Sequence, residues 1–122
     1  MKETGIQRVV PNIYSNNIER SKLFYNGFLG MKLAMDMGWI LTFISNDNPT
    51  AQISVFKNTG NKPLDNTAIF ISVEVSNVDY LYNRAKEQNI EIVYPLTNEE
   101  WDVRRFFVKD PNGATINILM HL

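Results

Sequence analysis

The stretch RRFFVKDPNGATINIL, residues 104–119, decides the fold. Two apolar, β-rich runs flank Asp110-Pro111-Asn112-Gly113. Proline presets φ for the first central position of a turn and lacks the N–H that a strand ladder needs, while Gly113 carries no Cβ penalty. The stretch therefore predicts a β-hairpin. Beyond its turn an apolar row alternates with a mixed row, so the last strand has one apolar face and one mixed face: Ile116, Ile118 and Met120 against Thr115, Asn117 and Leu119.

Composition indicates an ordinary globular protein. The chain has 122 residues, 44% of them hydrophobic and 20% charged, which predicts a single domain over residues 1–122. Its net charge of −1 favours neither nucleic acid nor an anionic membrane as a partner. No cysteine is present, so disulfides and thiolate chemistry are excluded. The N-terminus lacks the apolar core of a signal peptide, and a cytoplasmic location is expected.

The two halves of the chain carry the same order of elements. Asn17-Ile18 and Asn77-Val78 stand 60 residues apart, and each pair follows a predicted strand and begins a predicted helix. Expected in the first half are a helix at 18–28 and strands at 7–14, 31–37, 39–45 and 51–56. Expected in the second half are a helix at 78–88 and strands at 68–75 and 90–94, then a loop at 95–100 and the hairpin. Such a period indicates a duplicated supersecondary unit.

The closing pattern R-x-F-x-x-x-D-P-x-G-x-x-I resembles the end of the vicinal oxygen chelate superfamily, which includes glyoxalase I, extradiol dioxygenases and bleomycin-resistance proteins. The helix entry Asn17-Ile18-Glu19-Arg20-Ser21, followed by Phe24-Tyr25, is similar to the family's D-x-E-R-S…F-Y, with Asn in place of Asp. The resemblance implies an α+β fold of two βαβββ modules. These modules would cover about residues 6–56 and 68–121, with a linker at 57–67.

In its metal-dependent members this family takes ligands from four inward-facing strand positions. Carried onto this chain, they fall at Val10, Ser54 (or Gln52 with a register slip of two), Phe70 and Asn117. Metal sites for zinc or iron require imidazole, thiolate or carboxylate groups. The sequence therefore predicts no metal site and no cofactor.

Other catalytic groups are few. The chain has no G-x-S-x-G elbow and no P-loop. His121, its only imidazole, is expected to be a solvated bystander, and Glu99-Glu100 a solvated pair in a loop. Strand parity places Glu74 on the same face as Phe70. It is either a base or cation partner in a cavity, or a strand-end residue that reaches water or an arginine.

Trp39 and Trp101 stand outside the apolar stripes of the predicted helices. They are expected either to form the walls of a binding site or to serve plain packing or a dimer contact. Arg104 and Arg105 resemble a commonly basic position of the family, and the alternative is an ion pair with Asp102 or a glutamate.

These features predict a small-molecule binding or sequestering protein that is similar to the bleomycin-resistance branch. The alternatives are a glyoxalase-like lyase with an atypical or metal-independent site, and a structural or regulatory interaction module. The family resemblance implies a homodimer, and an inward carboxylate favours an aromatic, cationic ligand. The residues predicted to bind it are Asn12, Trp39, Ser54, Phe70, Glu74, Trp101, Arg105 and Asn117.

Overall fold

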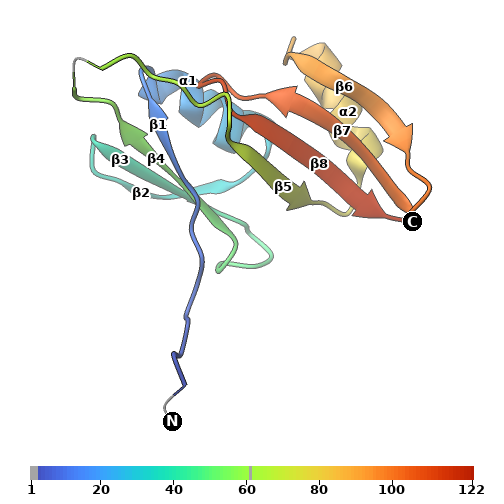
Figure 1. Cartoon of the computed structure of the whole chain (residues 1–122), viewed down its shortest axis with the longest axis horizontal. Coiled ribbons are helices and arrows are strands. Elements are labelled where there is room, and N and C mark those ends of the chain that lie inside the picture. The colour runs from blue at the N-terminus through green and yellow to red at the C-terminus, as the bar shows by residue number, and fades with distance from the viewer. Residues whose placement is uncertain (1–2, 61) are drawn as a thin grey trace. The chain divides into compact units, whose positions relative to one another are not determined.

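A computed structural model describes residues 3–60 and 62–122 of the chain. They fold into two compact units, Met1–Asn61 and Lys62–Leu122, with the boundary inside the predicted linker. Each unit holds one four-stranded sheet and helical structure against one face of that sheet (Figure 1). The α+β fold of two βαβββ modules is confirmed.

The first unit contains β1 (Asn12–Ser15), α1 (Ile18–Lys22), η1 (Leu23–Phe28), β2 (Lys32–Asp36), β3 (Ile40–Ile44) and β4 (Gln52–Lys57). Its sheet has the order β1-β4-β3-β2, with β1 parallel to β4 and the other pairs antiparallel. The Asn17 side chain caps α1 by accepting from the backbone N–H of Arg20, as its residue type predicts.

The helix predicted over 18–28 is α-helical for little more than one turn and then widens into the π-helix η1. The backbone N–H of Leu29 accordingly donates to the carbonyl of Phe24, five residues back. This helical segment buries Phe24, Tyr25 and Phe28 against the sheet's apolar face, where the rings of Tyr25 and Phe43 lie 5.4 Å apart. Apolar periodicity predicts a helix but does not separate a 3.6-residue turn from a wider one.

The second unit contains β5 (Phe70–Glu74), α2 (Val78–Glu87), β6 (Ile92–Asn98), β7 (Val103–Lys109) and β8 (Thr115–His121). The sheet has the order β5-β8-β7-β6, with β5 parallel to β8. Asn77 caps α2, and Asn89 follows the helix with φ 55°, a left-handed conformation that asparagine adopts at helix ends. No helix in the described part of the chain is long and apolar enough to cross a lipid bilayer.

Two predicted boundaries are wrong, both because of proline. The strand predicted over 7–14 begins only at Asn12, since Pro11 offers no N–H to the ladder, and upstream a single bridge joins Val9 to Ala51. The loop predicted over 95–100 is instead largely strand, because β6 continues through Pro95 to Asn98. β6 is an edge strand, and its pairing with β7 shifts register between Tyr94 and Thr97, which accommodates the proline.

The turn between β7 and β8 is built around the buried carboxylate of Asp110. Its Oδ1 accepts from the backbone N–H groups of Asn112 and Ala114, both at 2.9 Å. Gly113 has φ +93°, a conformation that side chains with a Cβ rarely adopt. The predicted hairpin is confirmed, and seven paired positions from Val103↔His121 to Lys109↔Thr115 set its register.

Candidate functional site

The helix-free face of the second unit's sheet gathers large aromatic and polar side chains. Strand parity separates the two faces, since Phe106 contacts Tyr82 of α2 and Arg104 pairs with Asp79 of α2, whereas Arg105 and Phe107 point away from the helix. We call this surface the aromatic face; its members are Phe70, Tyr94, Trp101, Arg105, Phe107 and Asn117.

Arg105 is the centre of the aromatic face. Its guanidinium lies 4.8 Å from the ring centre of Phe107, 5.2 Å from that of Trp101 and 5.5 Å from that of Tyr94. Its Nη2 and Nε reach Oε2 of Glu99 at 2.7 and 2.9 Å. The hydroxyl of Tyr94 donates to the other oxygen of Glu99 at 3.0 Å. Ring stacking, ion pairing and hydrogen bonding therefore hold one another in place and make a rigid platform.

Two aromatic side chains of this face remain largely open to solvent. Phe70 is 52% exposed and meets Phe107 edge-on at 5.1 Å, and Trp101 is 60% exposed in the short turn between β6 and β7. Tyr94 and Phe107 stack between them at 4.7 Å. Exposed aromatic rings on a rigid support provide apolar contact area at low entropic cost, which suits a flat ligand.

Glu74 and His121 form a pair at one end of the same face. Oε2 of Glu74 lies 2.8 Å from Nδ1 of His121, and both side chains are exposed. Glu74 opposes Leu119 in the register of β5 with β8, two residues along β8 from Asn117. His121, expected to be a solvated bystander, is exposed to solvent but pairs with Glu74, so the Glu74 carboxylate contacts an imidazole and not an arginine.

The first unit presents a similar helix-free face. Asn12 opposes Ser54 across β1 and β4, and the buried Ser54 hydroxyl lies 3.0 Å from that of Thr42. Trp39 is 51% exposed and contacts Phe56, which also contacts Tyr14. Asn12, Trp39 and Ser54 thus share one face of the first sheet. The other predicted binding residues share one face of the second.

The family's ligand positions do not suit a divalent metal. Val10 and Phe70 offer hydrocarbon, and Ser54 and Asn117 offer neutral oxygen or nitrogen atoms, so no anionic group would compensate the charge of the ion. Within residues 3–60 and 62–122, no three His, Asp or Glu side chains lie close enough together to hold a metal ion.

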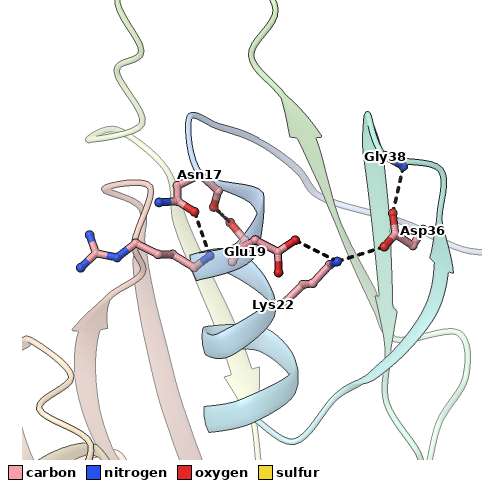
Figure 2. Close-up of polar contacts among 7 residues, drawn as sticks. Asn17, Glu19, Lys22, Asp36 and Gly38 are labelled. Atoms are coloured by element: carbon pink, nitrogen blue, oxygen red, sulfur yellow. Dashed lines mark hydrogen bonds and ion pairs between the residues drawn. The ribbon is translucent and has the colours of Figure 1, made fainter.

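An open cavity of about 530 Å³ lies in the first unit, beside the start of α1. Figure 2 shows Lys22 from α1 between Glu19 and Asp36, at 3.2 and 3.1 Å, with Asp36 also accepting from the backbone of Gly38. None of the predicted binding residues lines it. Its lysines, Lys22 and Lys57, are matched by the two carboxylates, so the cavity has no net charge with which to attract an ion.

The Asp36 contacts predict a pH dependence of stability. The N–H of Gly38, and then Lys22, lower the pKa of Asp36 below its ordinary value of 3.8. A carboxylate with a lowered folded-state pKa stabilises the fold above its unfolded pKa, and this contribution is lost as pH falls through the folded value. Asp36→Asn should therefore reduce Tm at pH 7 and flatten its decline between about pH 5 and about pH 3. Asp47→Asn, an exposed loop carboxylate, is the control; if both variants followed the wild-type curve, the contact would not contribute.

Sequence reasoning missed two members of the aromatic face, Tyr94 and Phe107, and the carboxylate that supports it, Glu99. Glu99 was expected to be solvated, but its side chain is only 10% exposed and pairs with Arg105. Tyr94 and Phe107 were not singled out. Strand alternation over residues 103–109 could have identified Phe107. It places Phe107 on the same face as Arg105, and Phe106 on the opposite face with Arg104.

Comparisons with known proteins agree with this architecture. The model of the Glyoxalase/Bleomycin resistance protein/Dioxygenase superfamily matches residues 5–118. No curated protein matches the sequence.

Several solved structures have a similar fold. A glyoxalase/dioxygenase from Nostoc punctiforme has a TM-score of 0.82 at 17% identity, and the match covers 100% of this chain and 96% of the Nostoc chain. TioX from Micromonospora sp. ML1 has a TM-score of 0.79 at 18% identity, covering 95% and 99%. A glyoxalase/bleomycin resistance protein/dioxygenase from Nocardioides has a TM-score of 0.74 at 19% identity, covering 99% and 87%. The chain belongs to the glyoxalase/bleomycin resistance protein/dioxygenase superfamily.

Proposed function

We propose that this protein binds and sequesters a small aromatic molecule on the aromatic face, in the manner of the bleomycin-resistance members of its superfamily. One observation carries the proposal: Phe70 and Trp101 are half exposed or more, yet stand on a platform that Arg105 and Glu99 hold rigid. Preorganised aromatic area lowers the entropic cost of binding. The donor set at the family's metal positions supports a binding role over metal-assisted lyase chemistry.

The ligand class follows from the charges around this surface. Arg105 is already paired with Glu99, so it is not available to an anionic ligand. Glu74 has only an imidazole as its partner, in an exposed pair that a ligand amine is able to displace. We therefore propose a planar ligand with a cationic amine.

The probe for this function is 9-aminoacridine, a flat cationic aromatic amine. It should quench the fluorescence of Trp101 on binding, and Trp101→Phe should remove that signal while Trp39→Phe keeps it. An EDTA-treated sample should bind equally well, because no metal takes part. Absence of quenching in wild type, with no binding heat in calorimetry, would rule the function out.

The charged end of the face makes a second prediction for the same probe. Glu74→Gln should weaken binding of 9-aminoacridine by about 1 kcal/mol, the loss of one charge-assisted hydrogen bond. His121→Gln should strengthen binding, since the carboxylate is then released from its imidazole. Calorimetric titration measures both, and equal affinities in the two variants would remove the electrostatic part of the proposal. Light scattering on the same samples tests the homodimer that the family resemblance implies.

A further inference from the structure

Asn117 holds a buried hydrogen-bond acceptor that nothing satisfies. Its side chain is 95% buried, being 5% exposed, and its Nδ2 donates to the hydroxyl of Ser72 at 3.0 Å. Its Oδ1 has no hydrogen-bond partner among the described residues. A buried acceptor without a donor costs free energy, so such groups are rare in folded proteins unless a ligand or water supplies the missing donor.

The corresponding position of the first unit has no such defect. In the first unit Asn12 of β1 opposes Ser54 of β4, and in the second unit Ser72 of β5 opposes Asn117 of β8. Ser54 and Asn117 therefore occupy equivalent positions in the two sheets. Ser54 is also buried, but its hydroxyl pairs with Thr42. The fold therefore permits a satisfied side chain at this point of the sheet. The unsatisfied oxygen is a property of Asn117 and not of the architecture.

The acceptor lies on β8, between the strands that carry Phe70 and Phe107. β5 and β7 flank β8, so the contact between the rings of Phe70 and Phe107 crosses β8. In register Phe107 opposes Asn117, and Phe70 opposes Thr115, so the two rings meet above this segment of β8. Phe70 is half exposed, and side chains at such exposed positions change rotamer rapidly.

We propose that Asn117 Oδ1 accepts a hydrogen bond from a ring N–H of the ligand, which makes that ligand an N–H heteroaromatic amine. This inference rests on the proposed function. Glu74 opposes Leu119, two residues from Asn117, so the amine would lie about 7 Å from the ring N–H. Indole-3-ethylamine compounds carry both groups at about this separation. A site built to accept a ring N–H rejects analogues that lack it, because its buried oxygen then stays unpaired.

Three probes test the hydrogen bond in calorimetric titrations of the full chain. Tryptamine supplies the N–H, 1-methyltryptamine replaces it with a methyl group, and 2-(benzofuran-3-yl)ethylamine replaces it with an oxygen acceptor. We expect wild type to bind tryptamine about tenfold or more tightly than either analogue. Equal affinity for tryptamine and 1-methyltryptamine would overturn the inference, as would a preference for the benzofuran. Binding of 9-aminoacridine is measured in the same preparation. If 9-aminoacridine binds but tryptamine and its analogues bind equally, only this inference fails; if 9-aminoacridine does not bind, the proposed function fails.

An isosteric variant supplies the second arm. Asn117→Leu removes the acceptor at similar volume, so tryptamine should lose its advantage over 1-methyltryptamine. Because the unpaired oxygen is also removed, the Tm of this variant should equal or exceed that of wild type. Ser72→Ala is the control, because it touches only the Nδ2 side of the amide and should keep the tryptamine preference. A tryptamine preference that survived in Asn117→Leu would overturn the assignment.

Discussion

Replacement of Arg105 by methionine is expected to destabilise the protein by about 2 to 3 kcal/mol. The variant keeps apolar bulk against the surrounding rings but leaves the Glu99 carboxylate without its cation in a mostly buried position. Removing one partner of a fully buried ion pair costs more stability than this. The Arg105 side chain is 23% exposed, so its pair with Glu99 is intermediate between a buried and a surface ion pair. Urea unfolding measures the loss as a lower midpoint with an unchanged slope. Binding of 9-aminoacridine should weaken as well, because Trp101 and Tyr94 lose the group that holds them together.

The neighbouring arginine is the matched control. Arg104 pairs with Asp79 at 2.7 Å on the opposite face of β7, and this arginine lowers the pKa of Asp79. The carboxylate is largely exposed, so Arg104→Met should cost much less stability than Arg105→Met and leave aromatic binding intact. Glu99→Gln added to Arg105→Met should restore part of the lost stability, because the unpaired charge is gone. Equal losses for Arg104→Met and Arg105→Met would contradict the central position of Arg105.

Replacement of Asp110 by alanine should cost about 2 to 3 kcal/mol. The carboxylate accepts hydrogen bonds from the backbone N–H groups of Asn112 and Ala114. Without it, both N–H groups would lose their acceptor inside the turn that joins β7 to β8. Asp110→Asn keeps one side-chain oxygen and should lose roughly half as much. Thermal and urea unfolding of both variants measure this order. A loss below about 0.5 kcal/mol for alanine, the range of ordinary surface substitutions, would show that the turn does not depend on the carboxylate.

Several features of the fold were predictable from short stretches of sequence. Asn17 and Asn77 cap their helices, and Asn89 ends the second helix in the left-handed region, because each role depends on a side chain and its own neighbouring backbone. The 60-residue repeat predicted two equivalent modules, and the pairs Asn12↔Ser54 and Ser72↔Asn117 now occupy matching places in them.

Other features depended on the balance between local preference and sheet pairing. Proline disfavours a strand at both Pro11 and Pro95. Strand β1 begins only after Pro11, whereas β6 continues through Pro95. β6 tolerates Pro95 because it is an edge strand with irregular pairing there. The widening of the first helix into η1 likewise depends on how Phe24, Tyr25 and Phe28 pack on the sheet, which no local pattern records.

The sequence by itself determined the superfamily, the two modules and the face on which Asn117 lies, since strand alternation and turn chemistry are local properties. Only the tertiary structure decided what these side chains contact. Arg105 meets Glu99 and Trp101 across the turn between β6 and β7, and Glu74 of β5 meets His121 of β8. Register also places Ser72 beside the Asn117 nitrogen, and no described residue donates to the Asn117 oxygen. Contacts between strands depend on which residues the pairing brings opposite each other, and a pattern read along one strand does not contain that information.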